Sequence, residues 1–333
     1  AGLYPPGSTY KMITAAAALQ TGVVNVNTTY DDTGSINLPG HTYYGWNPKG
    51  LGEENIIGAI AQSSDIYFYT VAGGNPNLGA VPHVGADRLA QFARLFGLGS
   101  PTGIELPGEP AGSVPSQTWF DRLKPGPLKN PGDSWHIGDT YNMAIGQGFN
   151  TATPLQMCNV TATIANGGTL YKPRIIERIV GRVVPRRGPL PRQVTLQPFV
   201  PQIIRRNFVD PGNISLIQQG MHLGVSATQP WFGTSWLVHD PRIDAAGKTG
   251  TAEDPHGAPD AWWTGYAPYN NPKIAVTVLV PNAAAEGAYY AAPIAHKIME
   301  DYFHLKPFLP DKPGDANWLD DVTQQEVSSA GAQ

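Results

Sequence analysis

The chain has 333 residues, of which 41% are hydrophobic and 14% are charged, and its formal net charge is −4. This length and composition predict a globular protein of one large or two ordinary domains. The one cationic cluster, 182–192, is interleaved with Pro and Gly, so we interpret it as a solvated loop and expect no nucleic-acid partner. The composition therefore argues against a nucleic-acid-binding protein.

Helical periodicity, taken in chain order, predicts helices starting near Ser8 and covering 55–62, 66–72, 86–96, 153–166, 213–223 and 288–302. Gly97 and Gly167 are placed as C-terminal caps, and Pro154 and Pro211 lie near helix starts. The single cysteine, Cys158, falls in a helical pattern and is expected to be a buried structural thiol.

Strand-like segments concentrate late in the chain, at 169–176, 247–253, 261–267 and 274–280. The short linker 267–273 suits a hairpin between neighbouring antiparallel strands. Two segments look irregular: 101–139 is dense in Pro and Gly, and 182–201 is dense in Arg and Pro. The second is expected to be a mobile insertion. A helical body that precedes an antiparallel sheet predicts an α+β fold.

The first predicted helix carries a serine and a lysine one turn apart. Pro5-Pro6-Gly7 cannot continue a helix, so Ser8 lies in the first turn, and residues three apart share a face, so Lys11 projects beside it. An N-cap serine followed by a solvated lysine gives the same pattern, and S-x-x-K is expected by chance about 0.4 times in this composition. The motif alone leaves both interpretations open.

Two later stretches strengthen the catalytic interpretation. Residues 247–252 read GKTGTA, and K-T-G-T is expected by chance on the order of a hundredth of a time in such a chain. Ser63-Ser64-Asp65 separates two predicted helices, where it also has the form of an ordinary N-cap sequence. The eight histidines form no H-E-x-x-H pattern, which argues against a histidine-based metal site.

The motifs S-x-x-K, S-x-D and K-T-G, in this order, resemble those of penicillin-binding proteins and serine β-lactamases. Longer stretches are similar to class B penicillin-binding proteins, most closely the elongation type (penicillin-binding protein 2), in which S-x-D is common and a G-D-T precedes the GQG segment. They are YPPGSTYK at 4–11, FGLGSPTGIELPGE at 96–109, AIGQGFNTATPLQM at 144–157 and WWTGYAPYNNPKIAV at 262–276. The resemblance implies an antiparallel sheet flanked by helices, with a helical subdomain.

Acyl transfer needs a deprotonated nucleophile, donors for the developing oxyanion and a proton source for the leaving amine. The resemblance assigns the nucleophile to Ser8 and the general base to Lys11, which must be buried and neutral to accept a proton. It makes Ser63 a proton relay, Asp65 a hydrogen-bond partner of Lys11, and Lys248 a nearby cation that lowers the pKa of Lys11.

The third motif is expected to bind substrate. The hydroxyls of Thr249 and Thr251 suit a carboxylate, and Gly250 has no side chain, so an extended peptide could pair with the strand edge. The oxyanion hole of the family maps onto the backbone N–H groups of Ser8 and Thr251.

By resemblance, the chain is a peptidoglycan D,D-transpeptidase that cross-links stem peptides through a Ser8 acyl-enzyme and is inhibited by β-lactams. The family requires no metal or organic cofactor. It implies roles in cell-wall synthesis and cell shape, with a SEDS glycosyltransferase and a rod-complex scaffold as partners, at the outer face of the bacterial cytoplasmic membrane.

Three alternatives stay open. A β-lactamase uses the same motifs, but the E-x-x-L-N stretch of class A enzymes is missing between the second and third motifs. A D,D-carboxypeptidase differs only in its acceptor. A β-lactam sensor or a non-catalytic wall-synthesis scaffold would not release D-Ala over repeated turnovers.

Residues 1–312 are expected to form the transpeptidase domain, and 313–333, which lack apolar periodicity, a disordered tail. Relatives carry a membrane anchor, a pedestal domain and the leading strands of the sheet before S-x-x-K. Since S-x-x-K stands here at residue 8, we expect the domain to lack those strands and the chain to be a piece of a longer protein.

Overall fold

The computed structural model describes residues 2–130, 132–183, 192–226, 232–253, 257–283 and 287–306. The predicted tail at 313–333 lies outside the described residues. Within these ranges, helices combine with antiparallel strands, which confirms the α+β prediction. No helix in the described ranges is both long and apolar enough to cross a lipid bilayer.

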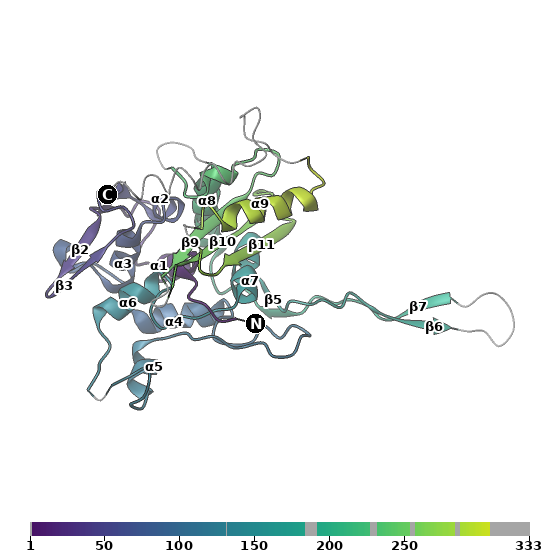
Figure 1. Cartoon of the computed structure of the whole chain (residues 1–333), viewed down its shortest axis with the longest axis horizontal. Coiled ribbons are helices and arrows are strands. Elements are labelled where there is room, and N and C mark those ends of the chain that lie inside the picture. The colour runs from purple at the N-terminus through teal and green to yellow at the C-terminus, as the bar shows by residue number, and fades with distance from the viewer. Residues whose placement is uncertain are drawn as a thin grey trace.

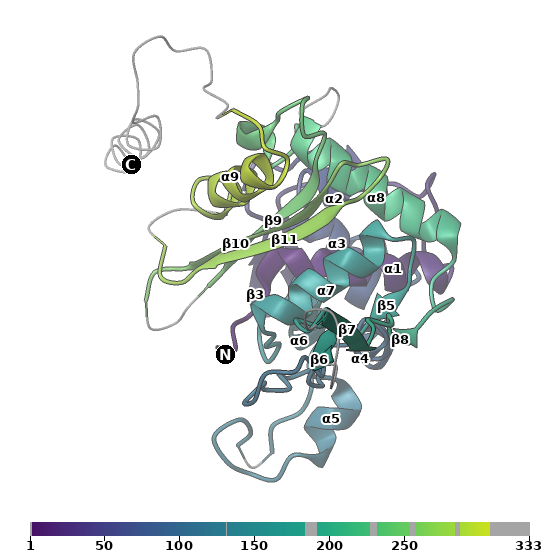
Figure 2. The same ribbon diagram turned by 90° about the vertical axis from the view of Figure 1, so that its right-hand side faces the viewer.

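The central sheet consists of β9 (Ala246–Ala252), β10 (Asp260–Ala267) and β11 (Ile274–Val280), in the order β11-β10-β9 with antiparallel pairing throughout. The predicted hairpin joins β10 to β11. Side chains alternate along a strand, so Trp262 enters the main core while Trp263 packs in a second core beneath α9 (Ala291–Tyr302) (Figure 2). Helices thus cover both faces of the sheet, and β10 is buried throughout.

A short 3-10 turn, η1 (Gly7–Tyr10), leads into α1 (Lys11–Gln20), which is buried along almost its whole length. Its four consecutive alanines let neighbouring helices approach closely. The helices around it and on the sheet are α2 (Ile56–Ala61), α3 (Asp65–Gly73), α4 (Ala86–Leu95), α6 (Ile137–Ala144), α7 (Pro154–Ala165) and α8 (Pro211–Ser226). Each predicted helix is present with its ends shifted by at most three residues.

Helix ends follow the capping chemistry of their sequences. The side chains of Asn55, Ser64 and Thr153 accept hydrogen bonds from the first-turn N–H groups of α2, α3 and α7. Gly97 and Gly167 have positive φ angles of 95° and 84°, as expected for C-terminal caps.

Three local predictions were wrong. The segment 182–201 is not a plain loop, because β6 (Ile179–Val183) pairs with β7 (Arg192–Gln197) in a hairpin that projects from the body (Figure 1). The segment 101–139 contains α5 (Gln117–Arg122) and the start of α6. The predicted strand 169–176 shrinks to β5 (Leu170–Tyr171), paired with β8 (Ile203–Arg205). Strand pairing depends on partners distant in sequence, which local composition does not reveal.

Residues 30–54 form two small antiparallel pairs that the sequence did not predict. The strand β1 (Tyr30–Asp32) pairs with β4 (Gly52–Glu54), and β2 (Ser35–Leu38) pairs with β3 (His41–Tyr44). Strands of three or four residues are too short for a periodic signal. Two further 3-10 turns are η2 (Pro76–Leu78) and η3 (Trp236–Val238).

Cys158 lies on α7 with its thiol directed at the Ala275 carbonyl of β11, 3.6 Å away. Burial raises the pKa of this thiol, although the residue keeps some exposure. These contacts fit the predicted structural role.

Candidate active site

The turn that carries Ser8 is wedged between β9 and the end of α6. Gly7 has a φ of 54°, and its N–H donates to the Gly146 carbonyl at 3.0 Å. A Cβ on Gly7 would lie 2.8 Å from the Thr251 carbonyl oxygen, and a Cβ on Gly146 would overlap the Gly7 carbonyl. Only glycine combines this backbone conformation with such close contact. Ser8, half-buried, is therefore held beside the third motif.

The first and second motifs meet at Lys11. Its Nζ donates to the Ser63 carbonyl at 2.6 Å, to Ser63 Oγ at 3.1 Å and to Asp65 Oδ1 at 2.6 Å. The lysine side chain is completely buried, so these contacts are shielded from water. The structure thus brings together three of the predicted residues, and the expected hydrogen bond between Lys11 and Asp65 is present.

Burial lowers the pKa of both lysines in the site, Lys11 and Lys248. Burial lowers the pKa of Lys11 below its usual value, while the charge and hydrogen bond of Asp65 act in the other direction. Burial, followed by repulsion from Lys11, holds the pKa of Lys248 well below its usual value. Lys248 Nζ donates to a neutral acceptor, the Thr249 carbonyl, at 2.9 Å.

This electrostatic arrangement differs from the sequence-based expectation. Burial and a nearby cation, Lys248, were both expected to lower the pKa of Lys11. Burial is indeed the main cause at Lys11, whereas the repulsion is found at the other amine, where Lys11 lowers the pKa of Lys248. Burial lowers the pKa of both amines, so each releases its proton more readily than an exposed lysine does. A neutral amine in this pair can accept a proton.

The second motif has an unusual backbone. Ser63 has a φ of 59°, a left-handed conformation uncommon for a residue other than glycine, at the junction of α2 and α3. Ser64 caps α3, and Trp46 donates its backbone N–H to Asp65 Oδ2 at 2.9 Å and its indole N–H to the Gln62 carbonyl at 3.0 Å. The conformation of Ser63 is therefore fixed from both sides.

The third motif runs along β9, an outer strand of the described sheet. The Thr249 hydroxyl donates to Thr234 Oγ1 at 2.7 Å, and Thr251 is half-buried beside the turn of Ser8. A Cβ on Gly250 would lie 3.0 Å from the Thr9 methyl group. Packing against η1 is thus a second reason, besides substrate access, for glycine at this position.

Sequence reasoning missed three residues around the motifs. Trp46 binds the second motif, Thr234 binds Thr249, and Gln147 directs its amide N–H at the Thr251 carbonyl, 3.5 Å away. Gln147 lies in the GQG segment, which could have signalled a role. Trp46 and Thr234 lie in loops without a motif, so no local pattern could have found them.

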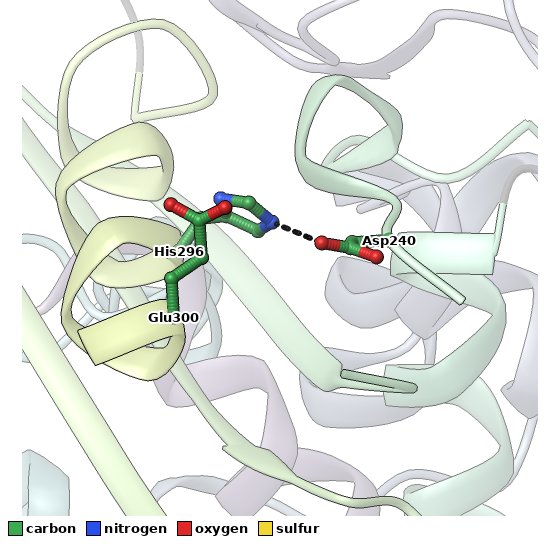
Figure 3. A group of neighbouring side chains, drawn as sticks. All are labelled: Asp240, His296 and Glu300. Carbon is green, nitrogen blue, oxygen red and sulfur yellow. Dashed lines mark hydrogen bonds and ion pairs between the residues drawn. The ribbon is translucent and has the colours of Figure 1, made fainter. Parts of the chain in front are cut away.

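A separate polar cluster joins α9 to the loop before β9. Asp240, His296 and Glu300 bring one ligand atom each within 4.8 Å of the others (Figure 3). The Arg242 guanidinium donates to Asp240 at 2.9 Å and to Glu300 at 3.2 Å, and it holds the pKa of Asp240 below its usual value against the effect of burial. Because an internal cation already balances the carboxylates, we interpret the cluster as an ion-pair network. His296 and Glu300 are four residues apart on α9, which places both side chains on one face of the helix.

Comparison with known proteins now adds to this geometry. A family model described as the penicillin binding protein transpeptidase domain matches residues 1–300. The chain belongs to the penicillin-binding protein transpeptidase family. The resemblance predicted from the three motifs is thereby confirmed, together with the fold.

This penicillin-binding protein chain is 35% identical to peptidoglycan D,D-transpeptidase MrdA of Haemophilus influenzae, over 92% of the chain and 45% of that relative. It is similar to the crystal structure of Pseudomonas aeruginosa PBP2 in complex with WCK 5153, with a TM-score of 0.75, 32% identity, and coverage of 95% of this chain and 64% of that one. Helicobacter pylori PBP2, solved in complex with MreC, gives a TM-score of 0.71 at 28% identity, with coverage of 91% and 50%. The chain spans about half the length of the curated relatives it matches.

Proposed function

We propose that this chain is the transpeptidase part of an elongation-type peptidoglycan D,D-transpeptidase, with Ser8 as its nucleophile. The observation that carries the proposal is the convergence of Ser63 and Asp65 on the buried amine of Lys11, one helical turn from Ser8. The names of the similar MrdA and PBP2 proteins support the same reaction class.

In the proposed first half-reaction, Ser8 Oγ attacks the carbonyl of the penultimate D-Ala of a stem peptide while a neutral lysine amine accepts its proton. Lys11 is the proposed base, because burial favours its neutral form and a neutral amine keeps two donors for Asp65 and the Ser63 carbonyl. The lone pair left over can then face a hydroxyl.

The tetrahedral oxyanion is proposed to accept hydrogen bonds from the backbone N–H groups of Ser8 and Thr251. The intermediate collapses as the C–N bond breaks, and Ser63 passes a proton to the leaving D-Ala amine. An acceptor amine then attacks the Ser8 ester, and the seryl oxygen recovers its proton. The hydroxyls of Thr249 and Thr251 are proposed to bind the substrate carboxylate, and the extended donor peptide is proposed to lie along β9 at Gly250.

We further propose that the whole protein acts at the outer face of the cytoplasmic membrane with a SEDS glycosyltransferase and a rod-complex scaffold. The solved complex of the similar H. pylori PBP2 with MreC supports this class of partner. β-Lactams are proposed to acylate the same serine.

Intact-protein mass spectrometry after incubation with benzylpenicillin, followed by peptide mapping, tests the nucleophile. We expect one adduct on Ser8, lost in Ser8→Ala and kept in Ser100→Ala, which alters an exposed serine outside the motifs. An adduct that persists in Ser8→Ala would place the nucleophile elsewhere. Hydrolysed drug without an adduct would indicate a β-lactamase.

A second assay with stem peptide separates the remaining alternatives. D-Ala release coupled to incorporation of an acceptor amine is the expected result. Release without incorporation would indicate a carboxypeptidase, and acylation by penicillin without any D-Ala release would indicate a sensor or scaffold.

A further inference from the structure

The second motif depends on a strained residue. A non-glycine residue in the left-handed region is strained, and this conformation persists only where its surroundings enforce it. Ser63 has this conformation and is 94% buried, since only 6% of its surface is exposed. The contacts that enforce it are therefore functional candidates in their own right.

Two acidic residues outside every motif make such contacts. Ser64 Oγ donates to Asp32 Oδ2 at 2.6 Å, and the Gln62 amide donates to Glu54 Oε1. The residues on either side of Ser63 are thus each bound to a buried carboxyl group, 3% exposed in Asp32 and fully buried in Glu54.

The register of the β1–β4 pair explains why these two acids point inward. Asp32 lies opposite Gly52, and Glu54 lies two residues further along the same strand, so the two carboxyl groups are diagonal neighbours on one face. Asp31 and Glu53, one position before each, face solvent. The chain therefore contains an inward and an outward acid side by side on each strand.

Burying two carboxyl groups together is unfavourable unless they are bonded or neutral. Asp32 accepts from Ser64 and from the Gly34 N–H at 2.9 Å, whereas Glu54 Oε2 has no hydrogen-bond partner among the described residues. Such an arrangement weakens the local fold, and it is found directly behind the second motif.

We propose that Asp32 and Glu54 are positioning residues that hold Gln62 and Ser64, and through them Ser63 and Asp65, in the geometry needed for acylation at Ser8. This inference rests on the proposed function of the motifs. Asp32 acts through the Ser64 hydroxyl and Glu54 through the Gln62 amide. Neither acid is proposed to touch substrate.

The test measures benzylpenicillin acylation of the full chain by stopped-flow or quench, which separates the non-covalent binding constant from the acylation rate constant. We expect Asp32→Ala to lower the acylation rate constant about 10- to 100-fold, the effect typical of small misplacement of catalytic groups, with the binding constant changed less than about twofold. Asp31→Ala is the matched control and should behave as wild type.

Asp32→Asn separates a loss of positioning from a loss of folding, because the asparagine side chain can accept a hydrogen bond from the Gly34 N–H and donate one to the Ser64 hydroxyl. It should recover most of the acylation rate. Ser64→Ala should also slow acylation, and the losses should be less than additive in the double variant, because both changes break the Ser64–Asp32 contact. Each single variant loses one further contact, the Tyr67 N–H cap for Ser64→Ala and the Gly34 N–H bond for Asp32→Ala. Glu54→Ala and its control Glu53→Ala repeat the comparison on β4.

Several results would overturn the proposal: wild-type acylation in Asp32→Ala, a loss confined to the binding constant, an equal loss in Asp31→Ala, or additive losses in the double variant. If wild type itself is not acylated, the proposed function fails instead. The two failures are thereby distinguishable.

Discussion

The Glu54 carboxyl group allows a quantitative prediction of how stability changes with pH. Burial, and then the nearby Asp32, raise the pKa of Glu54 from 4.5 to about 8, while the Gln62 hydrogen bond acts in the opposite direction. An unfolded chain loses this proton near the ordinary value, whereas the folded protein keeps it until about pH 8. Between these values the folded state binds one more proton than the unfolded state, so its stability falls as pH rises.

The size of the effect follows from proton linkage. Each pH unit well inside this window costs about 1.4 kcal/mol of unfolding free energy, and the cost per unit falls as pH approaches the folded-state pKa, so from pH 6 to pH 8 the loss is about 2 kcal/mol. Glu54→Gln removes the titrating proton while keeping an oxygen for the Gln62 amide. Relative to this variant, wild type should lose about 2 kcal/mol over the same interval.

Urea unfolding followed by tryptophan fluorescence at half-unit pH steps measures the difference directly. Glu53→Gln, which changes the neighbouring exposed acid, should follow the wild-type curve. If the wild-type and Glu54→Gln curves ran parallel from pH 5 to pH 9, the carboxyl group would be ionised in the folded protein, and the reasoning about its burial would be wrong.

Two further predictions concern the motifs. Gly7→Ala should destabilise the protein by about 1–3 kcal/mol and slow penicillin acylation, because alanine is strained at a φ of 54° and would press on the Thr251 carbonyl. Gly22→Ala is the control, since Gly22 has a φ of 71° but lies in open space. Equal acylation rates in the two variants would contradict the role of the Gly7 contact. Asp65→Asn should move the acid limb of the acylation pH profile to lower pH, because the Asp65 charge raises the pKa of Lys11; a shift to higher pH would exclude Lys11 as the titrating base.

The sequence predicted those parts of the fold that have a local signal. Periodicity and caps located the helices, and IAVTVLV located β11 at its observed bounds. The hairpin of β6 and β7 was taken for a loop because its arginines, prolines and glycines have low strand propensity, and only pairing between its two arms reveals it. The motifs were found because their spacing repeats that of a known family.

The surroundings of the motifs could not be predicted in the same way. Asp31 and Asp32 are identical in type, as are Glu53 and Glu54, and nothing local tells which member of each pair faces inward. That choice is made by the register of two three-residue strands. Likewise, the lowered pKa values of Lys11 and Lys248 depend first on burial in the folded chain, which no local pattern reveals.

The contacts of Asp32, Trp46 and Glu54 with the second motif bear on how altered drug response would be traced in genomes. A survey that compares only S-x-x-K, S-x-D and K-T-G between strains would report identical active sites in two chains that differ at residue 32 or 54. On the proposed positioning role, reduced β-lactam susceptibility is expected from changes in the paired strands β1 and β4, which precede Ser63 in the sequence.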